Sequence, residues 1–196
     1  MGNIVAELRN PTVKAKRLRR GGKIPCAVYG GTLKEPLLIQ MDERTAENLL
    51  REKREGSKVR LEVDGRVITS QIKEVSRNCV SRDVEHISFQ ALSADRKVNS
   101  IAQVLLLNKD SVQGIVEQML FEIPYSAYPE DMIDTVTVDL ENHVAGDQLT
   151  VGELEAFKNK NIDLHVDADA LIYKIIDRKH TAEAESAGSS EKASAE

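Results

Sequence analysis

Two strand-like stretches flank the pair Asp64-Gly65, and this arrangement restricts the surrounding chain to a β fold. In residues 59–63 the apolar side chains of Val59, Leu61 and Val63 recur at alternate positions, and residues 67–75 return as the partner strand. Apolar residues with a period of two place one face of a strand in a protein core. An Asp-Gly pair is favoured in the tight turns that join antiparallel strands. The sequence therefore predicts a β-hairpin over residues 59–75.

The rest of the first half repeats this strand pattern in short stretches separated by turn residues. One helix is expected over residues 45–54, with Asp42 as its N-cap and Gly56 after its end. Six or more short strands with one helix favour a small β-barrel over a parallel layered fold. The strand-like stretches are residues 3–9, 25–29, 36–41 and 84–92.

The last of these stretches separates two kinds of side chain. Alternation is expected to direct Ile87, Phe89 and Ala91 into the core. His86 and Ser88 share the other face, but no acid or oxyanion site accompanies them, so they do not predict a catalytic nucleophile. The residues of the outward face are Val84, His86, Ser88 and Gln90.

The segment from Lys14 to Lys23 is strongly basic. Six of its ten residues are Lys or Arg, and no Asp or Glu occurs in residues 8–34. We interpret it as a loop closed by Gly21-Gly22, whose backbone freedom suits a tight turn. A basic loop that runs into a short apolar strand can hold phosphates against a rigid edge, and RNA is the leading polyanion. The alternatives are a solvated basic loop and a chance match to a localisation signal.

Charge is distributed unevenly along the 196 residues, which carry a formal net charge of −5. Residues 1–97 contain 20 Lys and Arg against 13 Asp and Glu, whereas residues 98–196 contain 7 against 19. Such asymmetry predicts a basic binding module joined to an acidic module with another task. We place these modules at residues 1–95 and 96–178. Residues 179–196, rich in Ala, Ser, Glu and Lys, are expected to form a disordered tail.

The acidic module is expected to be mostly β. A turn-rich connection with two tyrosines is expected over residues 124–134. Residues 147–154 are expected to hold a short strand and one helical turn. The other strand-like stretches of this module are residues 99–107, 114–123, 135–140, 164–166 and 170–176.

Several kinds of chemistry find no support in the sequence. It contains no GxxxxGK[ST], GxGxxG or HExxH motif. Cys26 and Cys79 form no CxxC pair, and the four histidines are too dispersed for a site shared with a cysteine. Asp167 and Asp169 are better explained as a solvated strand face. We therefore expect no enzyme, no metal site and no cofactor. A membrane-span or signal-peptide pattern is also missing, so a cytoplasmic protein without a membrane partner is expected.

Three segments resemble the signatures of one protein family. RLRRGGKIPCAVYGG at residues 17–31 is similar to RRLRxxGKxPAVxYG, the first signature of the bacterial L-twenty-five ribosomal proteins that bind 5S rRNA. The second, IKEVQRHPVxxxxxHVDF, is similar to IKEVSRNCVSRDVEHISF at residues 72–89. Residues 128–154, YPEDMIDTVTVDLENHVAGDQLTVGEL, resemble LPxxIPxxIEVDVSxLxxGDxIHVxDL in the second domain of the long form, the general stress protein CTC type. The resemblance extends to about Ile176.

The resemblance implies a six-stranded β-barrel with a short helix, bound to loop E of 5S rRNA in the large ribosomal subunit beside other ribosomal proteins. Double-stranded RNA is recognised mostly through phosphates, a wide shallow groove and a few polar contacts. By match to the motifs, Tyr29 is expected to lie against the RNA backbone and His86 to supply a polar groove contact. Phosphate contacts are expected from Arg9, Lys14, Lys16, Arg17 and Arg19.

The chain departs from the family pattern at positions expected to face bases or hydrated metal in the groove. Ser76 stands where the family has Gln, Ser88 where it has Asp, and Asn78-Cys79 where it has His-Pro. Serine makes fewer contacts, so specific readout should weaken while phosphate attraction persists. The alternative function is a stress-linked interaction protein of the same family with weakened or no 5S rRNA binding. A single-strand or DNA binder is disfavoured because stacking aromatic residues are few.

Overall fold

The computed structural model describes residues 3–31, 33–141, 143–158 and 161–177. The tail expected at residues 179–196 lies outside the described residues. The chain divides into two compact units. The first comprises Met1–Ile101 with Ser126–Asp134, and the second comprises Ala102–Tyr125 with the residues from Thr135 onward.

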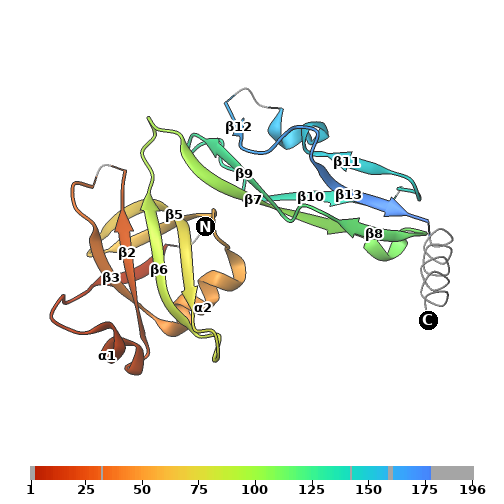
Figure 1. Cartoon of the computed structure of the whole chain (residues 1–196). Coiled ribbons are helices and arrows are strands. Elements are labelled where there is room, and N and C mark those ends of the chain that lie inside the picture. The colour runs from red at the N-terminus through yellow and green to blue at the C-terminus, as the bar shows by residue number, and fades with distance from the viewer. Residues whose placement is uncertain (1–2, 32, 142, 159–160, 178–196) are drawn as a thin grey trace, which may run out of the picture. The chain divides into compact units, whose positions relative to one another are not determined.

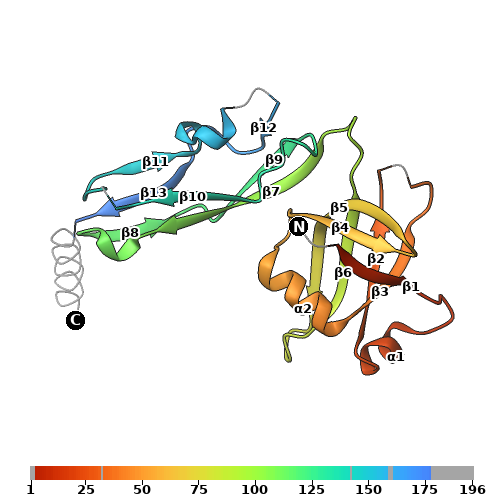
Figure 2. The same ribbon diagram turned by 180° about the vertical axis from the view of Figure 1, so that it is seen from behind.

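The first unit contains a closed β-barrel (Figure 1). Its strands are β1 (Ile4–Leu8), β2 (Lys23–Tyr29), β3 (Leu37–Asp42), β4 (Lys58–Val63), β5 (Arg66–Arg77) and β6 (Val84–Ala91). Their order around the barrel is β1-β3-β2-β6-β5-β4. The pairs β1–β4 and β2–β6 are parallel and the others are antiparallel. Figure 2 shows β1, β3 and β4 from the opposite side. The barrel confirms the predicted mainly β fold with a six-stranded first domain.

Alternation along the strands fills the barrel with mostly aliphatic side chains. Leu61, Ile72, Ile87 and Phe89 are each completely inaccessible to solvent. Burying a side chain of this size stabilises a fold by about 1.5–3 kcal/mol relative to leaving it exposed. The core residues of β6 are therefore those predicted from its alternation, with one exception.

Val84 is that exception, because it joins the barrel core and does not face outward with His86. The register of β5 and β6 is irregular at this point. Ser76 lies opposite His86, whereas the next residue, Arg77, lies opposite Val84. One additional residue on β6, Glu85, is thus accommodated as a β-bulge. A bulge reverses the direction of the side chains beyond it, so Val84 turns inward.

The basic segment forms a helix, α1 (Ala15–Arg20), and not the predicted loop. Ala, Lys, Arg and Leu all have high helix propensity, and the basic last turn complements the negative end of the helix dipole. Gly21 ends the helix by donating its N–H to the carbonyl oxygens of Arg17 and Leu18. Gly22 then adopts a φ of +72°, which glycine tolerates without strain. Figure 1 shows α1 at the end of the barrel where β2 begins.

Helix α2 (Glu43–Glu52) and the hairpin at Asp64-Gly65 agree with the sequence-based predictions. The helix begins and ends two residues earlier than predicted, and Asp42 occupies its N-cap position. Asp64 and Gly65 have φ values of +48° and +74°. Two consecutive positive φ values are typical of the type I′ turn, whose twist matches that of the flanking strands.

The remaining strands confirm that the second predicted domain is mostly β. They are β7 (Val98–Leu107), β8 (Ile115–Gln118), β9 (Glu122–Ala127), β10 (Thr135–Asp139), β11 (Gln148–Thr150), β12 (Asp163–Leu164) and β13 (Leu171–Ile176). They form one sheet of order β10-β7-β9-β12 and another of order β11-β13-β8. Short 3₁₀ helices lie between them at Lys109–Ser111, Val151–Glu153 and Glu155–Phe157.

The single strand predicted over residues 114–123 is in fact two strands that belong to different sheets. β8 pairs with β13, whereas β9 lies beside β7. Between them the N–H groups of Met119 and Leu120 both donate to the carbonyl oxygen of Ile172. The chain crosses from one sheet to the other at this point, a step that apolar alternation does not reveal.

Residues Ser126–Asp134 belong to the first unit and are held there by polar contacts. The Asp134 carboxylate accepts hydrogen bonds from the Lys53 ammonium at 2.5 Å and from the Lys58 backbone N–H at 3.2 Å. The Lys58 ammonium donates to the carbonyl oxygen of Pro129 at 2.8 Å. The first compact unit therefore uses chain beyond residue 95, where the change in charge placed the boundary.

Gly56 allows the start of β7 to approach the barrel closely. Its φ is +86°, and a Cβ atom there would lie 2.5 Å from the carbonyl oxygen of Ile101. The Ser100 hydroxyl donates to the Gly56 carbonyl oxygen at 2.9 Å. This glycine was predicted only as the end of a helix. It is also required for close packing, since any side chain would collide with backbone.

We predict that Asp134→Ala lowers the free energy of unfolding of the full chain by about 1–2 kcal/mol. The substitution removes a partly exposed ion pair and leaves the Lys58 N–H without its carboxylate partner. Urea denaturation measures the change, with the exposed Glu130→Ala as the control for loss of one negative charge nearby. Equal stability of the two variants would show that the Asp134 contacts do not hold this segment.

Candidate nucleic-acid interface

The outward face of β6 is the centre of the candidate surface, because β6 lies between β2 and β5. His86, Ser88 and Gln90 alternate with fully buried neighbours and are half-buried themselves. This is the face predicted from the sequence, apart from Val84. Strand pairing holds these three side chains at fixed spacing, since alternate residues of a strand lie about 6.5 Å apart.

The strands on either side bring further predicted residues to this face. On β5, Ser76 lies directly opposite His86 and Glu74 lies opposite Ser88. On β2, Ala27 lies beside Ser88. The Ser88 hydroxyl and His86 Nδ1 are 3.5 Å apart. Short side chains, those of Ala27, Ser76 and Ser88, thus share this face with the longer side chains of Glu74 and His86.

His86 is surrounded by charged groups of both signs. Partial burial is the main cause that lowers its pKa below the usual 6.5, and the positive charges of Arg9 and Arg19 act in the same direction. Glu74 opposes them. At neutral pH His86 is therefore an uncharged imidazole, which can donate one hydrogen bond and accept another.

Arg9 lies near His86 but already has a contact within the protein. Its Nη2 donates to the carbonyl oxygen of Val13 at 3.1 Å, and its Nε is buried without a hydrogen-bond partner among the described residues. Arg9 thus anchors the residues that lead into α1. This structural contact exists in addition to the phosphate contact predicted for it.

Helix α1 places the other predicted cations at the end of the same face. Ala15 and Leu18 are half-buried, so this side of the helix faces the barrel. Lys23, at the start of β2, pairs with Glu7 at 2.5 Å, and this hydrogen bond is the main cause that lowers the Glu7 pKa. The exposed basic residues of the segment are Lys14, Lys16, Arg17, Arg19 and Arg20.

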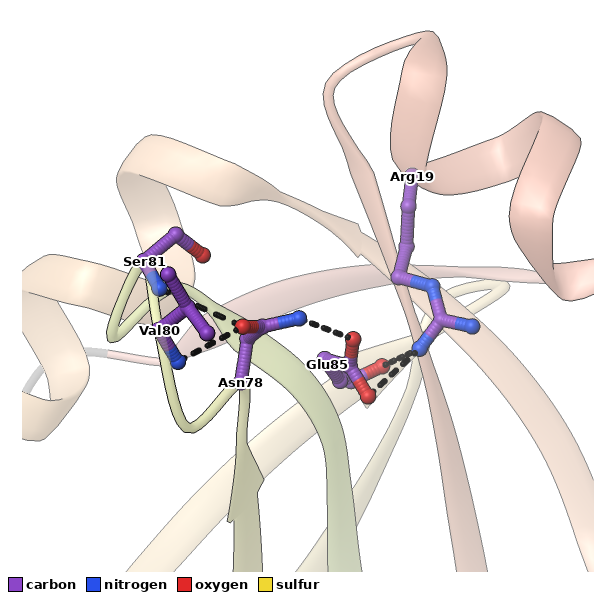
Figure 3. Close-up of polar contacts among 5 residues, drawn as sticks. All are labelled: Arg19, Asn78, Val80, Ser81 and Glu85. Atoms are coloured by element: carbon purple, nitrogen blue, oxygen red, sulfur yellow. Dashed lines mark hydrogen bonds and ion pairs between the residues drawn. The ribbon is translucent and has the colours of Figure 1, made fainter.

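Arg19 contacts the barrel through Glu85, the residue of the β6 bulge (Figure 3). Its Nη1 lies 3.4 Å from Glu85 Oε2 and also 3.4 Å from the Glu85 carbonyl oxygen. The other carboxylate oxygen of Glu85 accepts a hydrogen bond from Asn78 Nδ2 at 3.1 Å. The three residues border a cleft of about 370 Å³ between α1 and the turn at residues 78–83.

The structure brings most, but not all, of the predicted residues together. Arg9 and Arg19 act electrostatically on His86, which has Ser76 and Ser88 as immediate neighbours. Tyr29 lies beside Gln90, four residues along β6 from His86. At about 3.3 Å per residue this separation is roughly 13 Å. Tyr29, 37% exposed, therefore marks a second part of the same face. Lys14, Lys16 and Arg17 belong to the α1 segment.

Asn78 differs from its interpretation as a groove-facing residue. Its amide is engaged inside the protein, with Oδ1 accepting hydrogen bonds from the backbone N–H groups of Val80 and Ser81. Neither this role nor that of Glu85 was identified from the sequence. The contact of Glu85 with Arg19 spans 66 residues of chain. The Asn78 contacts are local, and an Asn that bonds the backbone two and three residues on is a recognised turn signal. Gln90 was predicted to lie on the outward face but was not included among the RNA-contacting residues. In the structure its Oε1 accepts a hydrogen bond from Gln71 Nε2 at 3.1 Å.

The described residues give no sign of a metal centre or a membrane span. No group of three or more His, Cys, Asp or Glu side chains within them is placed to bind a metal ion. No helix in the described ranges is long and apolar enough to cross a membrane. Cys26 is buried, which raises the pKa of its thiol to about 12, so it remains an unreactive core residue.

We predict that His86 makes the stability of the protein depend on pH. Because the folded-state pKa is lowered, the unfolded chain takes up a proton first as the pH falls. The contribution is fully present above the unfolded pKa of about 6.5 and is lost as the pH falls through the folded value. The neutral variant His86→Gln should therefore lose less free energy of unfolding than wild type between about pH 7.5 and pH 5. Parallel curves would show that the imidazole is not held neutral.

Comparisons with known proteins agree with this architecture. Residues 4–89 match the family model described as the Ribosomal L25p family. Residues 98–179 match the model described as Ribosomal protein TL5, C-terminal domain. The two models thus cover both halves of the chain, and the resemblance inferred from the signatures is confirmed.

Individual relatives give the same result. The large ribosomal subunit protein bL25 of Pseudoalteromonas translucida is 31% identical over 157 residues, which cover 76% of this chain and 76% of the relative. The bL25 protein of Halothermothrix orenii is 30% identical over 185 residues, covering 89% and 81%. These are ribosomal proteins and not enzymes, in agreement with the sequence-based expectation. This chain belongs to the bL25 family of large ribosomal subunit proteins.

Proposed function

We propose that the protein binds 5S rRNA, at loop E, as a structural component of the large ribosomal subunit. The observation that supports this most directly is the arrangement of the first unit. An imidazole and two serine hydroxyls lie on the outward face of the paired strands β5 and β6. Arg9 and Arg19 act electrostatically on the imidazole, and the basic helix α1 lies at the end of this face. Family membership supplies the ribosomal setting.

The geometry suits a double-stranded RNA ligand. Such RNA offers a wide, shallow minor groove and regularly spaced phosphates, and it is read mainly by shape and backbone contacts. A strand face with polar side chains complements a shallow groove. The cations of α1 complement the phosphates at its border, and the neutral His86 serves as a hydrogen-bond donor or acceptor in the groove. Tyr29, farther along the face, is assigned to the RNA backbone.

The proposal extends to the setting in which the protein works. We assign it to ribosomes in the cytoplasm, with proteins of the large subunit as further partners. We assign RNA binding to residues 1–95. The acidic second module is expected to contact a partner other than the RNA. The relatives described above are named for the large ribosomal subunit, so they lend no support to the stress-linked alternative. Comigration of the protein with the large subunit on a sucrose gradient is the expected result.

The first test of this function is the salt dependence of 5S rRNA binding. If about five cations meet phosphates, the logarithm of affinity should fall with the logarithm of salt concentration at a slope of about −3 to −5. Arg17→Ala should make the slope shallower by up to about one unit. The matched control is Arg66→Ala, an exposed cation at the far end of β5. If both variants keep the wild-type slope, α1 is only a solvated surface, and the proposed interface is wrong.

The second test concerns the departures from the family pattern. We expect Ser76→Gln to raise the ratio of affinities for 5S rRNA and an unrelated duplex by about fivefold to tenfold, since a longer amide beside His86 adds directional contacts. Ser88→Asp is a different case, because it places a carboxylate directly opposite Glu74. Like charges in that position should lower the free energy of unfolding by about 0.2–1 kcal/mol.

Titrations at one salt concentration and urea denaturation measure these two effects. Ser88→Asn is the neutral control for the second substitution. An unchanged affinity ratio for Ser76→Gln would mean that residue 76 does not face the RNA.

A further inference from the structure

We propose that Asn78 and Glu85 are positioning residues that set the selectivity of RNA binding by holding the Arg19 guanidinium in one orientation. The inference rests on the proposed function and adds two residues to it. Neither residue contacts RNA in this scheme. Asn78 orients Glu85, and Glu85 orients Arg19 (Figure 3).

The orientation of Asn78 is fixed by the turn in which it lies. Its backbone N–H donates to Asp83 O at 2.9 Å, and its own carbonyl oxygen accepts from Arg82 N at 3.0 Å. Its side-chain Oδ1 accepts from Val80 N at 2.9 Å and from Ser81 N at 3.2 Å. With the amide oxygen bound in the turn, the amide nitrogen must point the other way. Figure 3 shows it directed at Glu85.

Glu85 uses each of its carboxylate oxygens for a different partner. Oε1 accepts from Asn78 Nδ2 at 3.1 Å, and Oε2 lies 3.4 Å from Arg19 Nη1. The backbone carbonyl oxygen of Glu85 lies at the same distance from Nη1. The β-bulge makes this geometry possible, because it inserts Glu85 between the inward Val84 and the outward His86. Both the backbone and the carboxylate of Glu85 are therefore directed at Arg19.

Both contacts with Glu85 engage the same nitrogen of the Arg19 guanidinium. Nε and Nη2 take no part in these two contacts. Their N–H groups form a fork that matches the oxygens of a phosphate. A guanidinium held by Nη1 presents that fork in one direction, so it favours RNA whose phosphate lies at a defined place. An unrestrained arginine would accept phosphates at many places, as non-specific binding requires.

Stability is a poor explanation for this network. Arg19 and Glu85 are 35% and 40% exposed, and ion pairs this accessible contribute little to folding. A carboxylate beside a phosphate-binding arginine also weakens attraction to any polyanion. Glu85 therefore lowers the affinity of the surface for polyanions in general. Its orienting effect on Arg19 explains why a carboxylate lies in the site.

The test uses the full chain with two variants and one matched control. Asn78→Ser keeps the charge and keeps an oxygen that can accept from the turn N–H groups, but it cannot reach Glu85. Glu85→Gln leaves the Asn78 turn contacts untouched and removes the carboxylate. Glu43→Gln removes one negative charge from the border of the same cleft, at a residue that makes no ion pair with Arg19 in the described structure.

Each protein is titrated with 5S rRNA and with an unrelated RNA duplex at one salt concentration. We expect Asn78→Ser and Glu85→Gln each to lower the ratio of the two affinities by about fivefold to tenfold, since a bidentate contact supplies discrimination of this size. Glu43→Gln should strengthen binding to both RNAs and leave the ratio within about twofold. In an Arg19→Ala background, Glu85→Gln should have no further effect on the ratio.

A measurement without RNA reports the positioning directly. In wild type, the chemical shift of the Arg19 Nε–H NMR signal should differ from that of a freely rotating arginine. In Asn78→Ser and Glu85→Gln, this chemical shift should move toward the value of a freely rotating arginine. Thermal unfolding of all variants should remain within a few degrees of wild type, and Glu85→Gln alone carries the test if Asn78→Ser unfolds the turn.

Two outcomes overturn the inference. If wild type prefers 5S rRNA and both variants keep that preference, the network does not set selectivity, while the proposed function stands. If Glu85→Gln and Glu43→Gln change the ratio equally, charge and not orientation is responsible. A wild-type protein without preference for 5S rRNA would refute the proposed function itself, and the NMR signal would then show whether the restraint on Arg19 exists without serving recognition.

Discussion

The central constraint in the first unit is the pairing of β6 with β2 on one side and with β5 on the other. Closure of the barrel around this strand buries Ile87 and Phe89 completely. Because strand residues alternate, the same pairing must turn His86 and Ser88 outward. A shift of one residue in register would exchange the two sets. The hydrophobic core thus determines which polar groups reach the surface, and the candidate interface is a consequence of barrel closure.

The cations of the basic segment do not remain as isolated as they are in the sequence. No acid occurs in residues 8–34, yet Lys23 contacts Glu7 of β1 and Arg19 contacts Glu85 of β6. Glu74 adds a third carboxylate near His86. Such acids reduce the general attraction of the surface to polyanions. The orientation of the cationic side chains then contributes a larger share of the binding selectivity. A surface of this kind is suited to one RNA geometry more than to RNA in general.

The chain also joins its parts in a way that linear order does not show. Ser126–Asp134, which follow β8 and most of β9, contact Lys53 and Lys58 of the first unit. Because Gly56 has no side chain, the backbone at the start of β7 packs directly against it. The two family models meet between residues 89 and 98, near the change in charge. The compact first unit is therefore defined by contacts that cross this junction.

The sequence alone determined most of the strands, the α2 helix, the Asp64-Gly65 hairpin and the uneven charge, because each depends on neighbouring residues. The division of residues 114–123 between two sheets was not among them. The sequence also determined the family, through signatures that are continuous in the chain. The sequence did not reveal that the basic segment forms the helix α1. The high density of positive charge and the Gly21-Gly22 pair favoured a loop, although the individual residues have high helix propensity. Only the tertiary structure turned Val84 inward at a bulge and placed Glu85 and Asn78 beside Arg19. The contact between Arg19 and Glu85 joins residues 66 positions apart, and no local pattern of side chains encodes which distant strand will lie next to a given helix.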